Sequence, residues 1–198
     1  RISINTYSLS DILQHKVELP KDFRPLVYFT NYLKRGYYPF VLEDDFDVRL
    51  QQIINHTLES EIAAILSASR NNIEDYSLYI EEAGLISQLR DATGGVRGLG
   101  KVNKIYLDNT NLIYNLAHEN SNIGNIRETF FFNQTRVIAD VIASPASDFL
   151  INDITFEVGG KNKKQKQIQN IENSFIVKDD IEFGYMNIIP LWHFGMTY

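Results

Sequence analysis

The amino-acid sequence predicts a mixed α and β protein in three parts. They are a helical N-terminal segment, a helix-turn-helix that runs into a β-hairpin, and a C-terminal part with the order α-β-β-β-α-β. Apolar residues recur at helical spacing between residues 42 and 58. Strand-like runs flank a glycine-rich loop at residues 90–101, and more of them follow two helical stretches beyond residue 108. We expect boundaries at 1–60, 61–107 and 108–198.

The composition excludes several classes of protein. The chain has 198 residues, a net charge of −6 and no cysteine. Nucleic-acid binding through overall charge is therefore not expected, although a local basic patch remains open. Disulfides, thiolate zinc sites and cysteine nucleophiles are excluded. No apolar run approaches the roughly 20 residues that span a bilayer, so we expect a cytoplasmic protein without a membrane partner. Because the chain begins with Arg1, we expect it to be a piece of a longer protein.

The N-terminal segment is expected to contain two helices. An apolar and aromatic stretch at residues 26–33 is followed by Gly36 and Pro39, which are typical of a helix end. The second helix is expected at residues 42–58, where Phe46 begins the apolar stripe. We interpret both stripes as parts of a core and assign no site to them.

Residues 61–107 have the order of a winged helix, a variant of the helix-turn-helix. A short helix is expected to end near Leu66, and Ser69 is a suitable N-cap for a second helix that stops at Gly84. The glycine-rich loop at residues 90–101 would be the wing. Its two strands are expected at 85–89 and 102–107.

The start of the second helix carries side chains that could contact DNA bases, namely Arg70, Asn71 and Asn72. The same helix also carries several acidic side chains, which phosphates would repel. Contact with DNA and contact with another protein therefore both remain open.

The glycine-rich loop resembles a phosphate-binding loop only in part. Gly95 to Lys101 fits the pattern GxxxxGK, but Val102 stands where a serine or threonine would bind magnesium. Such a loop must also lead into a helix N-terminus, whereas Lys101 leads into an expected strand. We therefore expect no ATP-binding residue in this chain.

The C-terminal part is expected to alternate between helices and strands. Its last residues, 188–198, are apolar and are expected to pack on the body of the protein. The expected helices are at 109–117, 123–137 and 162–171, and the expected strands are at 137–143, 148–151, 154–158 and 174–177.

One hairpin of this part contains the candidate chemistry. If residues 152–153 form a two-residue turn, Phe149 lies opposite Phe156, and Asp148 lies opposite Glu157 on the other face of the sheet. Two opposed carboxylates destabilise a sheet unless a proton or a cation lies between them. Mg²⁺ prefers oxygen ligands, so Asp148 and Glu157 are candidate metal ligands.

Basic residues follow this acidic pair directly. Acids beside a lysine suit phosphodiester chemistry, in which the lysine offsets developing negative charge. The alternative is a solvated hairpin whose carboxylates pair with nearby lysines. The candidate phosphate-binding residues here are Lys161, Lys163 and Lys164.

The order α-β-β-β-α-β with these acids resembles the core of the PD-(D/E)XK nuclease superfamily. The resemblance implies catalytic roles for Glu128 on the helix, Asp148 on the second strand and Glu157 on the third, with Mg²⁺ as cofactor. The lysine of the motif falls on Gly159, so the match fails there. Lys161, two residues later, would have to take its place.

A second resemblance covers nearly the whole chain. In several strings the sequence is similar to the C-terminal half of predicted AAA-superfamily ATPases of bacteria, especially Bacteroides-like ones. The resemblance implies that an ATP-binding domain, absent here, precedes a winged helix and a nuclease-like domain, and that the stretch near Ile62-Ala63 is shortened. The strings are NYLKRGYYPF (31–40), YLDNTNL (106–112), GNIRETFF (124–131), FEVGGKNK (156–163) and IPLWHFG (189–195).

These observations favour the C-terminal recognition or assembly part of an AAA-type ATPase, associated with DNA and with its own N-terminal ATPase domain, rather than an independent enzyme. One alternative is a Mg²⁺-dependent nuclease that uses Glu128, Asp148, Glu157 and Lys161. Another is an oligomerisation module, because 12% of the residues are aromatic and Tyr37 and Tyr38 are expected to be exposed.

Overall fold

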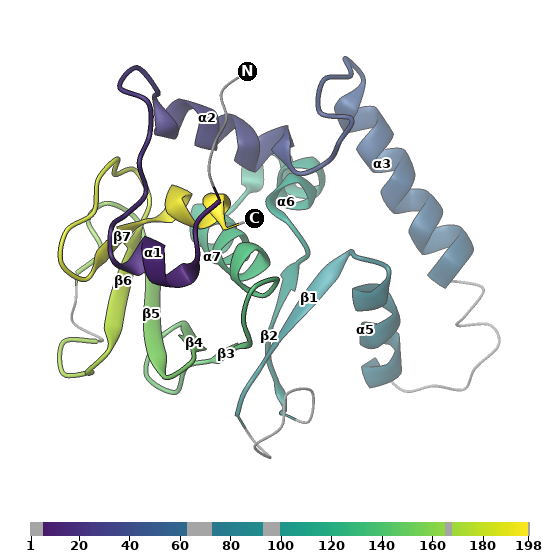
Figure 1. Ribbon diagram of the computed structural model, residues 1–198. Helices are drawn as coiled ribbons and strands as arrows, with labels where there is room; N and C mark the ends of the chain where they lie inside the picture. Colours follow the sequence, from purple (N-terminus) through teal and green to yellow (C-terminus); the bar gives the residue numbers. More distant parts are fainter. Residues whose placement is uncertain (1–5, 63–72, 93–99, 165–167, 198) are drawn as a thin grey trace.

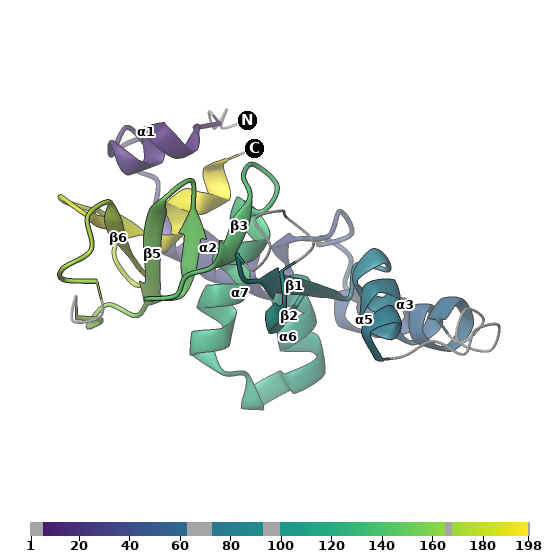
Figure 2. The same ribbon diagram turned by 90° about the horizontal axis from the view of Figure 1, so that it is seen from below.

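The computed structural model describes residues 6–62, 73–92, 100–164 and 168–197. The protein is a mixed α and β structure with a two-stranded and a five-stranded sheet (Figure 1). The hairpin of the smaller sheet lies between the larger sheet and helix α5, Ile73–Glu82, as Figures 1 and 2 both show. Arg70, Asn71 and Asn72 lie outside the described residues, as does the loop at 93–99.

The two N-terminal helices predicted from the apolar stripes are confirmed. Helix α2, Pro25–Asn31, continues as a π-helical turn to Gly36, and α3, Phe46–His56, continues likewise to Ile62. The short helix α1, Leu9–Leu13, precedes them and was not predicted. A capping box between Ser8 and Asp11 begins it.

Helix α5 and the hairpin form as the sequence predicts. Gly84 has a φ of 72° and ends α5, because this conformation is strained for any residue with a Cβ atom. The antiparallel strands follow, and Lys101 leads directly into the second of them, as expected. The turn between the two expected helices lies outside the described residues, so the winged helix stays a prediction. The strands are β1, Ile86–Arg90, and β2, Val102–Leu107.

Two predicted helices precede the larger sheet. Helix α6, Thr110–Ala117, is capped by Asn109, and a short 3₁₀ turn, His118–Asn120, follows it. Helix α7, Ile123–Thr135, is capped by Asn122, whose side chain accepts from two backbone amides of the first turn.

The five-stranded sheet has the order β3-β4-β5-β6-β7. The pairs β3–β4 and β4–β5 are antiparallel, whereas β5–β6 and β6–β7 are parallel. A 3₁₀ helix, Leu191–Met196, follows β7 and packs against α7, so the predicted packing of the last residues is confirmed. The strands are β3, Val141–Ala143, β4, Phe149–Ile151, β5, Ile154–Gly159, β6, Ser174–Lys178, and β7, Ile188–Pro190.

One expected element of this part is wrong, and another is shorter than expected. The helix expected at 162–171 is not formed by the described residues of that range, which lie in turns or irregular backbone. Its expected first turn gathers Lys163 and Lys164, and positive charges at a helix N-terminus oppose the helix dipole. The first strand begins at Val141 rather than at 137, because the backbone amides of Ile138 and Ala139 both donate to the carbonyl of Thr135 and close the end of α7.

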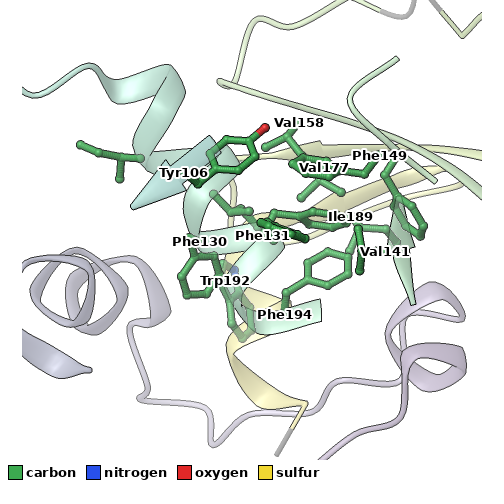
Figure 3. Close-up of a cluster of buried hydrophobic side chains, with 14 of the residues drawn as sticks. Tyr106, Phe130, Phe131, Val141, Phe149, Val158, Val177, Ile189, Trp192 and Phe194 are labelled. Carbon is green, nitrogen blue, oxygen red and sulfur yellow. The ribbon is translucent and has the colours of Figure 1, made fainter. Parts of the chain in front are cut away.

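The main core is built from aromatic side chains between α7 and the sheet (Figure 3). The ring of Phe131 lies about 5 Å from those of Phe149, Phe156 and Phe194, and all four side chains are buried. The same core includes residues of the N-terminal segment and of the hairpin, so the described parts of the three predicted segments share one core. The domain boundaries themselves stay a prediction.

Two expectations about the surface can be compared with the structure. Tyr37 and Tyr38 are only half exposed, and Tyr38 stacks on Phe40 and accepts from Asn109, so the expected exposed pair is wrong. Among the described residues, no helix is both long and apolar enough to cross a membrane.

Candidate acidic site

The hairpin register predicted from the sequence is confirmed. Phe149 pairs with Phe156. Asn152 and Asp153 have φ values of 47° and 64°, as a type I′ turn requires. Because side chains alternate along a strand, Glu157 lies on the face opposite the aromatic core.

Glu157 is a completely buried carboxylate with one charged partner among the described residues. The Lys163 Nζ atom lies 2.8 Å from Glu157 Oε1. Its approach does not have hydrogen-bond geometry, and neither carboxylate oxygen accepts a hydrogen bond from any described residue. A buried charge with so few partners is costly, because its desolvation is not repaid by hydrogen bonds.

The lysine beside the acidic pair is Lys163 rather than Lys161. A Cβ atom at Gly159 would lie 2.7–2.8 Å from three carbons of the Lys163 stem. The absence of a side chain at Gly159 therefore makes room for the stem of Lys163, four residues after Gly159, and lets its amino group reach Glu157. The side chain of Lys161 is exposed, and its carbonyl accepts from Lys178 Nζ at 3.2 Å. Lys164 is exposed as well.

Asp148 lies at the same place, directly before β4. Its Oδ2 atom accepts from the backbone amide of Val158 at 2.8 Å. Burial raises the pKa of Asp148, and the carboxylates of Glu128 and Glu157 raise it further, while the Val158 amide and Lys163 act in the opposite direction. The three acids named from the sequence therefore share one electrostatic environment.

Glu128 is held by the hairpin of the smaller sheet. Tyr106 donates its hydroxyl to Glu128 Oε2 at 2.8 Å, and Lys104 forms an ion pair with the same oxygen. Burial and the neighbouring Glu128 raise the pKa of Tyr106, so the phenol stays protonated and donates. The Lys104 Nζ atom also lies 5.1 Å from the centre of the Tyr106 ring.

Sequence reasoning did not find Lys104, Tyr106 or Arg127. Arg127 binds Asp179, with its Nε atom 2.9 Å from Oδ2, and a Cβ atom at Gly160 would lie 2.9 Å from its Nη1 atom. The adjacent glycines at 159 and 160 were the available signal, because such a pair marks a close approach of other groups to the backbone. The groups that approach come from different elements, which the local pattern does not reveal.

Asp148 and Glu157 could hold a divalent cation whose other ligands are water and phosphate oxygens. No three histidine or acidic side chains of the described residues gather closely enough to enclose a metal ion. Mg²⁺ in proteins commonly takes only one or two carboxylates and completes its shell with water and phosphate oxygens. The two oxygens of Glu157, buried without hydrogen bonds, and the nearby Asp148 suit that role.

Comparison with known proteins assigns the chain to no family. No protein-family model matches the chain, and no curated protein or solved structure matches it significantly. The case for function therefore depends on the acidic site.

Proposed function

We propose that this chain hydrolyses phosphodiester bonds in DNA with Mg²⁺ as cofactor. The observation that carries the proposal is that Lys163, whose stem occupies the space above Gly159, pairs with Glu157 and also acts on Asp148, which the carboxylate of Glu128 influences from the other side. The sequence of elements supports it in part. Helix α7 with Glu128, strands β3 to β5 and strand β6 follow the order of the nuclease core that the sequence resembles. The second helix of that order is missing from the described residues.

Asp148 and Glu157 would hold the metal. When bound, Mg²⁺ would polarise the phosphate and activate a water molecule. Lys163 would exchange its pairing with Glu157 for the negative charge that develops on the phosphate, which the flexible lysine stem permits. Glu128 would support the site as a third acid, and the hydrogen bond from Tyr106 holds its carboxylate in one orientation.

The position of Lys163 answers the main objection from the sequence. With a glycine at the lysine position of the motif and Lys161 as its substitute, catalysis was the weaker interpretation. A lysine 2.8 Å from Glu157 supports the nuclease alternative instead.

A cleavage assay with the full chain tests the proposal. Plasmid DNA is incubated with Mg²⁺ or with EDTA, and nicked and linear products are quantified. We expect Mg²⁺-dependent cleavage by the wild type and a loss of about 100-fold or more in Glu157→Gln, because the metal would lose a charged ligand. An inert wild type would contradict the proposal.

Two lysine variants provide a matched comparison. Lys163→Ala should reduce cleavage by about 100-fold, because it removes a charge that stabilises the transition state. Lys161→Ala removes an identical but exposed charge in the same loop and should change the rate by only about twofold, through weaker attraction of DNA. Equal effects of the two variants would argue that the lysines bind DNA without taking part in cleavage.

A second candidate is recognition or assembly without catalysis, as part of a longer ATPase. The observation in its favour is that Glu128 and Glu157 are already paired with Lys104 and Lys163. DNA titrations at two salt concentrations separate the candidates when combined with the assay. Salt-dependent binding without cleavage would support recognition.

A further inference from the structure

A cavity on another part of the molecule has the features of a small-molecule site. It has a volume of about 360 Å³ and is lined by residues of the segment joining α1 to α2, of the loop before β7 and of the 3₁₀ helix Leu191–Met196. This volume is at the lower end of the roughly 300–1,000 Å³ of ligand pockets. Its apolar lining includes Val17, Leu19, Phe23, Phe183 and Trp192.

Three ring nitrogens in the residues that line this cavity have no hydrogen-bond partner in the described part of the chain. They are Nδ1 of His15, Nε1 of Trp192 and Nδ1 of His193. The side chains of Trp192 and His193 are 4% and 5% exposed. A buried polar atom without a partner costs about 1–3 kcal/mol, so three around one cavity favour a ligand that satisfies them.

The hydrogen-bonding roles of two of these atoms are fixed. The Nε2 atom of His15 lies 2.9 Å from the carbonyl oxygen of Met186, which can only accept, so Nε2 carries the proton. In the neutral ring, Nδ1 of His15 is therefore an acceptor. The indole nitrogen of Trp192 can only donate. The lining thus requires a ligand that offers both an acceptor and a donor.

The ligand is expected to be uncharged. Lys21 and Glu182 also line the cavity and have opposite charges, so they give no net preference for an anion or a cation. Burial, and to a smaller extent His15, lowers the pKa of His193 to about 4, so this ring is neutral near pH 7. An ionic ligand would lose its hydration without gaining a buried counter-charge.

We propose that this cavity binds an uncharged nitrogen heterocycle of the nucleobase class, whose ring acceptor takes the Trp192 N–H and whose amino group donates to His15. The three nitrogens are shielded from water, so the lining side chains must shift slightly to admit the ring. The site is independent of the proposed phosphodiester hydrolysis, and its ligand is either a free nucleoside or a base of a single strand.

Trp192 is the single tryptophan of the chain, so its fluorescence reports on this cavity directly. The full chain is titrated with adenosine and with purine riboside, which has the same ring system without the amino group. Excitation at the red edge of the indole band avoids absorption by the nucleosides. We expect saturable quenching by adenosine and binding of purine riboside that is weaker by about tenfold, the value of one hydrogen bond.

Three variants make the test specific. Leu19→Phe fills the cavity without touching the ring nitrogens and should weaken adenosine binding by at least about tenfold, whereas Leu42→Phe, at a side chain 92% exposed, should leave it unchanged. His15→Phe removes the acceptor and should make adenosine and purine riboside bind alike. Thermal unfolding of each variant checks that the fold is retained.

A single-stranded oligodeoxyadenylate identifies the source of the base. Binding that is tighter than that of adenosine and is weakened by Leu19→Phe indicates a base within a strand, and absence of oligonucleotide binding indicates a free nucleoside. The proposal is overturned if adenosine does not quench Trp192, if purine riboside binds the wild type equally well, or if Leu19→Phe leaves adenosine binding unchanged.

Discussion

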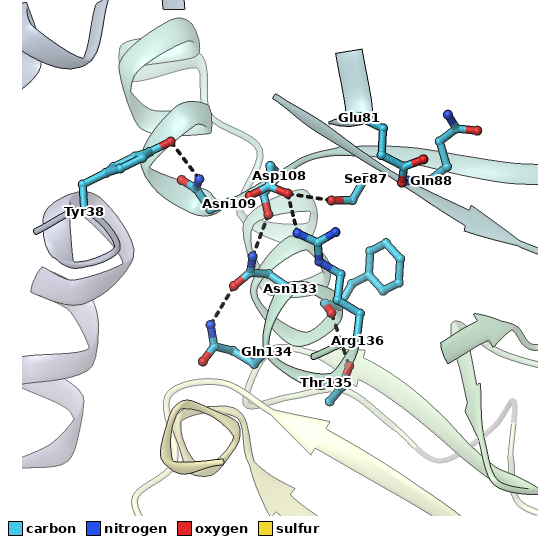
Figure 4. Close-up of polar contacts among 11 residues, drawn as sticks. Tyr38, Glu81, Ser87, Gln88, Asp108, Asn109, Asn133, Gln134, Thr135 and Arg136 are labelled. Carbon is cyan, nitrogen blue, oxygen red and sulfur yellow. Dashed lines mark hydrogen bonds and ion pairs between the residues drawn. The ribbon is translucent and has the colours of Figure 1, made fainter. Parts of the chain in front are cut away.

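Two buried carboxylates, Asp108 and Glu157, have opposite environments. Asp108 accepts from Ser87 at 2.9 Å and forms an ion pair with Arg136, and its backbone carbonyl accepts from Asn133 (Figure 4). Glu157 is more deeply buried and has only the Lys163 ion pair among the described residues. The hydrogen-bonded carboxylate of Asp108 links β1, which carries Ser87, to α7 and its C-cap residue Arg136. A buried carboxylate without hydrogen bonds is costly, and its oxygens are left free to bind another group, as in the proposed cation site.

The largest expected effect on stability is at Asp108, the carboxylate that accepts hydrogen bonds. Asp108→Asn should lower the free energy of unfolding by about 2–3 kcal/mol, because Arg136 loses its counter-charge. Arg136 keeps part of its side chain in water, which places the cost at the lower end of the range for buried pairs. Urea unfolding without Mg²⁺ measures it. A cost below about 0.5 kcal/mol would remove the distinction between the two sites.

The same substitution at the other carboxylate should behave differently. In the absence of Mg²⁺, Glu157→Gln should change the free energy of unfolding by about 1 kcal/mol or less, with an increase favoured, because an amide is cheaper to bury than an unsolvated carboxylate. Lys163 is not trapped by the loss, since its side chain is 33% exposed and can turn to water. A loss as large as that of Asp108→Asn would show that Glu157 is a structural ion-pair partner.

Mg²⁺ should make the wild type more stable than Glu157→Gln. A cation that binds only the folded chain stabilises it by about 1.4 kcal/mol at ten times its Kd. The wild type should gain stability on addition of Mg²⁺ and lose it again with EDTA, whereas Glu157→Gln should not respond. Asp108→Asn is the control, because it leaves the acidic site intact and should respond as the wild type does.

The third carboxylate, Asp148, should produce a pH dependence. Its pKa is raised in the folded protein, so folding favours the protonated form. Its contribution to stability is therefore present below the ordinary pKa of 3.8 and is lost as the pH rises through the higher folded value. Asp148→Asn can still accept from the Val158 amide and should be the more stable protein near pH 7, with no advantage near pH 3. Urea unfolding across this range tests the sign, and a variant that is less stable at pH 7 would contradict it.

The difference between the two regions also explains what the sequence could predict. The register of β4 and β5 follows from alternation and a two-residue turn, both of which are local, and so Asp148 and Glu157 could be named in advance. The contact of Lys163 with Glu157 depends on the path of the chain after Gly160, where a helix was expected and turns were found. The contacts of Glu128 with Lys104 and Tyr106 join helix α7 to strand β2 of the smaller sheet. No periodicity within one element encodes such a contact.

A substitution at Gly159 separates the role of Lys163 in cleavage from its role in stability. A Cβ atom in Gly159→Ala would lie 2.7–2.8 Å from Cβ, Cγ and Cδ of Lys163. Because the Lys163 Cβ atom is fixed to the backbone, the loop must shift, and the free energy of unfolding should fall by about 1 kcal/mol. The displaced lysine should also reduce Mg²⁺-dependent cleavage by about tenfold.

Gly84→Ala is the matched control, with a similar loss of stability and no expected loss of cleavage. Its new Cβ atom would have no neighbour within 4 Å, but the φ of 72° is strained for alanine, so stability should fall by about 1 kcal/mol while cleavage is unchanged. If Gly159→Ala cleaves DNA as fast as the wild type, Lys163 acts only as a counter-charge for Glu157. Another basic side chain would then have to stabilise the phosphate, and Lys104, which pairs with Glu128, is a candidate.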